Sequence, residues 1–228
     1  MRVRLRPWLD QLLRTFPFTL GLTGAVALIG ILSATAWHDD HAAIKRRLGT
    51  DLSALAHLRV DKFLLSPLYQ SKVGVGPDII IMLLLFVGAL EYLVGSWRAV
   101  LTFFASDAFA SVATIGALAA LGAMGWTHAH ELARRPETGS SAGMFACAAA
   151  AGVLLPSPWR EVGLAALYAF LLPSGLRFGL ATWIEHLAAS TFAAALSWRA
   201  WRPVARPAWF LPPLRARPPA GTALPPPR

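Results

Sequence analysis

Charged residues are scarce in this chain. Asp, Glu, Lys and Arg make up 14% of its 228 residues, whereas soluble domains carry about a quarter. Hydrophobic residues account for 56% of the chain, and its mean hydropathy is +0.52. A chain with so little charge is poorly suited to cover a water-facing surface. We therefore predict a membrane protein, most of which lies inside the bilayer.

Cysteine is almost absent, since Cys147 is the single one and lies within an apolar run. One cysteine excludes an intrachain disulfide and a cysteine-based metal cluster. Histidines in two loops are the remaining candidates for a zinc site; they are His38, His41, His128 and His130. Loops of this composition are common, so we expect neither a metal site nor another cofactor.

Acidic residues are also few: 12 Asp and Glu stand against 21 Lys and Arg, which gives a formal charge of +9. In a soluble protein this excess would indicate nucleic-acid binding. Here the arginines cluster at the two ends of the chain and in short loops. That distribution is typical of membrane topology signals, and we expect no nucleic-acid partner.

Six apolar runs are present. A crossing takes about 20 mostly apolar residues, or somewhat fewer where protein neighbours cover the polar ones. The runs are 19–36, 79–94, 99–124, 140–156, 162–173 and 180–198. The predicted fold class is an all-α polytopic membrane protein with six transmembrane helices. A signal peptide is the alternative for the first run, because Ala34-Thr35-Ala36 is similar to a cleavage site, but the run is long for one.

The predicted organisation has three parts. Residues 1–18 form a basic N-terminus, residues 19–198 a membrane domain, and residues 199–228 a Pro- and Arg-rich tail that we expect to be disordered beyond about 210. The first loop, 37–77, is long and has short pieces typical of interfacial helices. Arginines in both ends and in the second-to-third and fourth-to-fifth turns fall on one side of a six-span arrangement, which places both termini in the cytoplasm.

A G-x-S-x-G pattern, Gly139 to Gly143, lies where the fourth apolar run begins. Its small residues are consistent with close helix packing in a membrane. The alternative is a nucleophilic Ser141 with His186 in the sixth run as its general base, since serine needs such a base at neutral pH. In the six-span arrangement the two side chains lie within about 10 Å of each other in depth. Both interpretations stay open from the pattern alone.

Three further residues fit the catalytic interpretation. Gly139 permits a tight turn, and the backbone N–H groups of Ser140 and Ser141 at a helix start suit an oxyanion. Phe145 lies four residues after Ser141, on the same helix face, where its ring can pack against the imidazole. Glu91, near the end of the second run, is expected to be structural and to hold the turn that follows it.

This arrangement resembles the rhomboid family of intramembrane serine proteases, and most of all its divergent bacterial members. In that family a G-x-S motif opens the fourth of six helices, an aromatic residue follows four positions later, and the sixth helix carries a histidine followed by small residues. The matching residues are Gly139-Ser140-Ser141, Phe145, and His186 with Ala189 and Ala193. The resemblance implies a protease of the bacterial plasma membrane that cleaves transmembrane segments with a Ser141–His186 dyad and no cofactor.

The chain departs from the rhomboid pattern where the family completes its oxyanion hole. Rhomboids place His and Asn at the start of the second helix, and the corresponding positions here hold Val75 and Ile79. A second hypothesis is therefore a catalytically inactive rhomboid-like protein that binds or scaffolds membrane proteins. A third is a small transporter subunit that uses Asp107 and Glu185, although we find no inverted repeat.

Overall fold

The computed structural model describes residues 6–173 and 179–206 of the chain. Within these residues the regular secondary structure is helical, and one isolated antiparallel bridge joins Thr50 to Glu137. The disorder predicted beyond residue 210 lies outside the described residues.

Among the residues that the structure describes, three helical segments are long and apolar enough to cross a membrane. They are α2 (Pro17–Ala34), the continuous run Pro77–Val94, and α8 (Ser96–Ala123). The middle run consists of α6 (Pro77–Met82), the π-helical turn η2 (Leu83–Val87) and α7 (Gly88–Val94). Large apolar side chains face outward from these segments, 45–60% exposed, including Leu28, Ile31, Ile81, Leu85 and Phe109. These features are those of a helical membrane protein.

The other three predicted spans form shorter helices. They are α10 (Ser141–Leu154), α11 (Trp159–Leu171) and α13 (Leu180–Leu196), of 14, 13 and 17 residues. The chain stays helical beyond the predicted end of the sixth span, through the π turn η3 (Ser197–Trp201) and the 3-10 turn η4 (Arg202–Val204). A straight crossing takes about 20 residues, so a total of six crossings remains a prediction.

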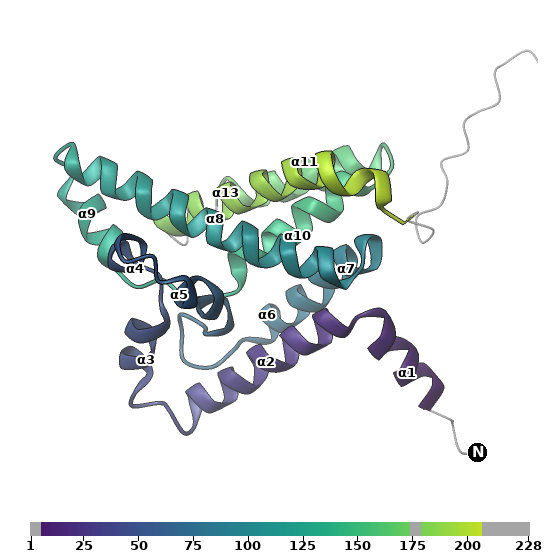
Figure 1. The fold of residues 1–228 in the computed structure, drawn as a ribbon, viewed down its shortest axis with the longest axis horizontal. Helices are drawn as coiled ribbons and strands as arrows, with labels where there is room; N and C mark the ends of the chain where they lie inside the picture. The colour runs from purple at the N-terminus through teal and green to yellow at the C-terminus, as the bar shows by residue number, and fades with distance from the viewer. Residues whose placement is uncertain (1–5, 174–178, 207–228) are drawn as a thin grey trace, which may run out of the picture.

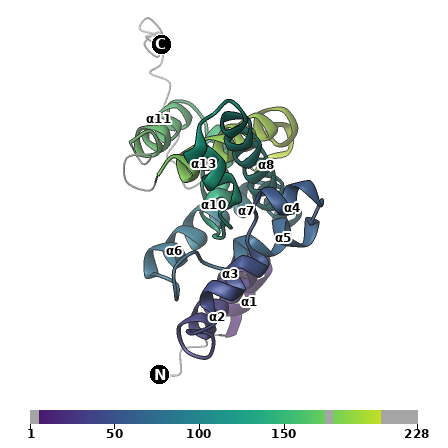
Figure 2. The same cartoon turned by 90° about the vertical axis from the view of Figure 1, so that its left-hand side faces the viewer.

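Helix α10 lies in the middle of the helix cluster and packs against α8, α13, α11 and α7 (Figure 2). Eleven of its 14 residues are buried, most of them Ala or Gly. Gly143 allows a close approach to α8, because a Cβ atom there would lie 2.6 Å from the Phe103 ring. Small residues thus allow α10 to be surrounded by other helices.

The two ends of the bundle differ in what they carry (Figure 1). At one end lie α1 (Arg6–Thr15), the turn between α7 and α8, and the residues that follow α13. At the other end lie the first loop and α9 (Thr127–Arg134), which leads to the start of α10. The start of α10 therefore lies next to the first loop.

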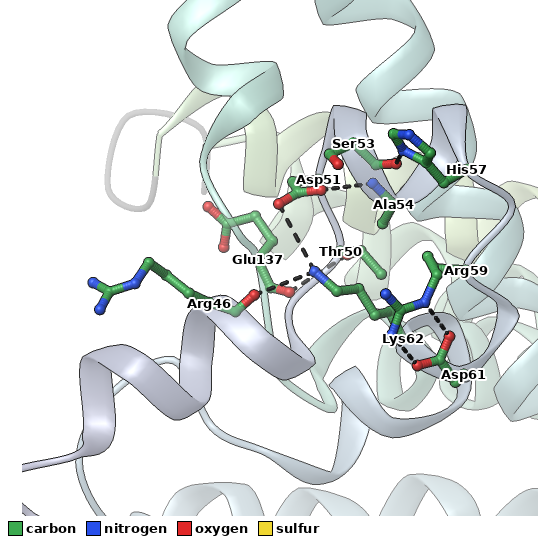
Figure 3. Close-up of polar contacts among 10 residues, drawn as sticks. All are labelled: Arg46, Thr50, Asp51, Ser53, Ala54, His57, Arg59, Asp61, Lys62 and Glu137. Atoms are coloured by element: carbon green, nitrogen blue, oxygen red, sulfur yellow. Dashed lines mark hydrogen bonds and ion pairs between the residues drawn. The ribbon is translucent and has the colours of Figure 1, made fainter.

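The first loop contains α3 (His41–Leu48), α4 (Leu52–Ala56), α5 (Val60–Leu65) and the 3-10 turn η1 (Ser66–Leu68). Lys62 joins these pieces, as its ammonium group donates to the Arg46 carbonyl at 3.2 Å and lies 3.9 Å from the Asp51 carboxylate (Figure 3). Arg59 and Asp61 form a further, exposed ion pair, and the Arg59 guanidinium lowers the pKa of the Asp61 carboxyl.

Glu91 is structural, but its partner is not the turn predicted from the sequence. Its carboxylate accepts hydrogen bonds from the backbone N–H of Phe18 at 3.0 Å, from that of Thr19 at 2.8 Å, and from the Thr19 hydroxyl at 2.6 Å. The first turn of a helix has N–H groups without partners inside the helix. Glu91 of α7 therefore caps the start of α2, which lies 72 residues earlier.

Candidate functional site

The turn before α10 presents Ser141 as the first residue of that helix. Gly139 has a φ of +141°, a conformation that side-chain-bearing residues rarely adopt. Ser140 follows and is fully buried. The glycines of the G-x-S-x-G pattern thus have separate roles: Gly139 permits the turn, and Gly143 permits the contact with Phe103.

Ser141 and His186 lie within hydrogen-bond distance of each other. The Oγ atom of Ser141 and the Nε2 atom of His186 are 2.9 Å apart, inside the usual range for a hydrogen bond. His186 comes from α13 and is 4% exposed. Its Nδ1 atom has no hydrogen-bond partner among the described residues. The pair is a hydroxyl within hydrogen-bond reach of an imidazole, a distance at which an imidazole can act as a base toward a serine.

Phe145 holds the imidazole from the side. Its ring lies one helical turn after Ser141, with its centroid 4.8 Å from that of His186. The same ring contacts Phe86 of η2 at 6.1 Å and Phe170 of α11 at 5.8 Å. Packing against Phe145 therefore helps to restrict rotation of the His186 ring, together with the contact between Nε2 and Ser141.

An apolar cavity of about 410 Å³ opens between the second predicted span, α10 and α11. Phe145 contributes to its wall, together with small residues such as Ala89, Ala148, Gly152 and Gly163. The ring that packs on His186 is therefore also accessible from this cavity.

On its polar side Ser141 borders a second cavity, of about 70 Å³. Asp107 of α8 and Glu185 of α13 line this cavity; Asp107 is buried, and Glu185 is partly buried. Asp107 lies beside the backbone amide of Gly143, and Glu185 accepts a hydrogen bond from Ser111 at 3.0 Å. Asp107 and Glu185, the two acidic residues considered for a transporter, thus lie near Ser141.

Val75 and Ile79 offer no hydrogen-bond donor from their side chains. Both pack against the hydrophobic core. Val75 also lies against α2, where a Cβ atom at Gly30 would come within 2.5 Å of it. The backbone N–H groups at the start of α10 remain as donors near Ser141.

Residues of the first loop that no sequence pattern indicated also hold the turn before α10. Gln70 donates through Nε2 to the Ser140 hydroxyl at 3.3 Å, and the Ser66 carbonyl accepts from the N–H of Gly139 at 3.0 Å. Glu137 pairs with Thr50 through two backbone hydrogen bonds of 2.9 Å. Burial raises the pKa of the Glu137 carboxyl, while Lys45 and Arg135 oppose that rise.

Two of the four loop histidines, His41 and His128, have other partners. His41 Nδ1 lies 2.7 Å from the Tyr69 hydroxyl and 3.2 Å from the Ser33 hydroxyl, and His128 lies 3.9 Å from the Glu131 carboxylate. Within residues 6–173 and 179–206, no three His, Cys, Asp or Glu side chains converge as metal ligands would.

Comparison of the chain with protein-family models, with curated proteins and with solved structures gave no match. The geometry of the site itself is therefore the basis on which a function can be assigned to the chain.

Proposed function

We propose that the protein is a rhomboid-like intramembrane serine protease that cleaves transmembrane segments. The observation that carries the proposal is the 2.9 Å contact between Ser141 Oγ and His186 Nε2, two residues 45 positions apart on α10 and α13. In this proposal α2, the run Pro77–Val94, α8, α10, α11 and α13 all cross the membrane. The shortness of α10 is compatible with a crossing because other helices surround it.

The chemical steps follow from the roles of the two side chains. His186 Nε2 takes the hydroxyl proton as Ser141 Oγ attacks the peptide carbonyl, and the carbonyl electron pair moves onto oxygen. The backbone N–H groups of Ser140 and Ser141 face this oxyanion. When the C–N bond breaks, His186 returns the proton to the leaving amine. Water then hydrolyses the acyl-enzyme, again with His186 as the base.

The substrate would be a single-span membrane protein that enters sideways from the lipid. The apolar cavity next to Phe145 supports this route, since its wall is made of apolar and small residues. We place the protein in the bacterial plasma membrane on its resemblance to bacterial rhomboids. Both termini are cytoplasmic in this proposal, on the arginine distribution of the sequence.

A catalytically inactive scaffold is the second candidate, and the apolar packing of Val75 and Ile79 favours it. Such a protein would use the same cavity to bind transmembrane segments without cleaving them. The two candidates differ in whether a peptide bond breaks.

Co-reconstitution in liposomes tests the proposal. The purified protein is mixed with a panel of single-span proteins, and fragments are identified by mass spectrometry. We expect two fragments whose new termini lie within the predicted span, and prior treatment with a fluorophosphonate should abolish them. Association with a span but no fragments from any panel member, with the protein still folded, would favour the scaffold.

A further inference from the structure

Gln70 is the first-loop residue whose side chain reaches the turn before Ser141. Its Nε2 atom donates to the Oγ of Ser140, which is fully buried. Its Oε1 atom lies on the Gly139 side, 3.9 Å from where a Cβ at that glycine would stand. The carboxamide therefore lies against the two residues that immediately precede Ser141.

The backbone that leads to Gln70 is held in place. Tyr69, its neighbour, is 1% exposed, stacks on the His41 ring with centroids 5.2 Å apart, and places its hydroxyl 2.7 Å from His41 Nδ1. Ser66 binds the N–H of Gly139, as described above. Gln70 thus has little freedom to move away from the turn.

The first loop also holds Glu137, which lies in the segment that leads to the turn. Thr50 and Glu137 lie side by side in Figure 3, paired through both of their backbone groups. Lys62 ties Asp51, next to Thr50, to the carbonyl of Arg46. Donors that stabilise a transition state need to be positioned in advance, and this loop provides such positioning.

Attack on a peptide carbonyl creates an oxyanion that needs preorganised N–H donors, and amide side chains serve well in that role. Val75 and Ile79 cannot donate, whereas the Gln70 carboxamide can. Its present bond to Ser140 Oγ is 3.3 Å long, beyond the usual 2.9–3.0 Å for N–H···O bonds, so turning toward a charged oxygen costs little. We infer that Gln70 is a catalytic residue that donates its Nε2–H to the oxyanion, a role that rests on the proposed protease function.

Two measurements on proteoliposomes test this role. The first is kcat and KM for a cleaved single-span protein, and the second is the rate at which a fluorophosphonate labels Ser141, because its phosphoryl oxygen occupies the same oxyanion site. Gln70→Ala should lower both kcat and the labelling rate about 10²–10³-fold, with KM changed little. Gln70→Glu, similar in shape but without the donor, should fall at least as far.

Two controls separate donation from simple support of the turn. Gln11→Ala, on an exposed face of α1, should keep wild-type kcat. Ser140→Ala keeps the backbone N–H of that residue but removes the resting partner of Gln70, and it should lower kcat less than Gln70→Ala does if the amide acts on the oxyanion. Equal losses in Gln70→Ala and Ser140→Ala, with no further loss in the double variant, would show a supporting role and overturn the inference.

The outcomes distinguish this role from the underlying function. A wild type that cleaves and labels, with Gln70→Ala and Gln70→Glu equally active, overturns the role of Gln70 alone. A folded wild type that neither cleaves nor labels at Ser141 overturns the protease function and this role with it.

Discussion

Replacing either Ser141 or His186 with alanine should lower peptide cleavage by about 10³–10⁴-fold. The physical reason is the 2.9 Å contact between Oγ and Nε2, through which the imidazole takes the proton that serine must lose. Because the two groups act as a unit, the double variant should lose no more than the single ones. The measurement is the initial rate of fragment formation in proteoliposomes, with each variant compared at equal amounts of folded protein.

His128→Ala is the matched control for the histidine, since that side chain is 65% exposed and lies in α9. It should cleave at the wild-type rate. A His186→Ala protein that keeps more than about a tenth of the wild-type rate would contradict the role of the imidazole as base.

Glu91→Ala should cost about 3 kcal/mol or more of unfolding free energy. The carboxylate is 1% exposed and accepts three hydrogen bonds from the first turn of α2. Its removal leaves two backbone N–H groups of that turn without this acceptor, in surroundings poor in water. The measurement is equilibrium unfolding in mixed micelles with increasing SDS.

Glu131→Ala is the control for loss of a carboxylate, because Glu131 is 78% exposed, and it should change stability by less than about 0.5 kcal/mol. Thr19→Val removes one of the three bonds and should cost about 1 kcal/mol. Its effect should largely vanish in the Glu91→Ala background. A cost below about 1 kcal/mol for Glu91→Ala would contradict the capping role.

Hydropathy predicted the helical elements well because a long apolar run in a membrane must pair its own backbone groups, and a helix does so within the run. The run predicted at 99–124 forms α8 at Ser96–Ala123, and that predicted at 140–156 forms α10 at Ser141–Leu154. The pairing of Ser141 with His186 was reached from span order and depth along the helices. Span order and depth can both be counted in residues along the chain, without knowledge of how the helices pack.

Contacts set by the loop and by helix rotation could not be predicted in the same way. Gln70 lies 70 residues before Ser140 and in a segment with no periodic pattern, so its approach to the turn depends on how the first loop folds. Glu91 was expected to hold the adjacent turn, but its side chain faces α2, because helix rotation is decided by tertiary packing.

The most direct test of the central claim is to identify the residue that a fluorophosphonate modifies in the folded protein. After labelling in liposomes, peptide mass spectrometry reads the modified position in the wild type, in Ser141→Ala and in His186→Ala. We predict modification of Ser141 in the wild type and none at that position in either variant, while Ser140→Ala is still labelled at Ser141. The account would be contradicted if the folded wild-type protein stayed unmodified at Ser141. It would also be contradicted if the His186→Ala variant were labelled at Ser141 as much as the wild type.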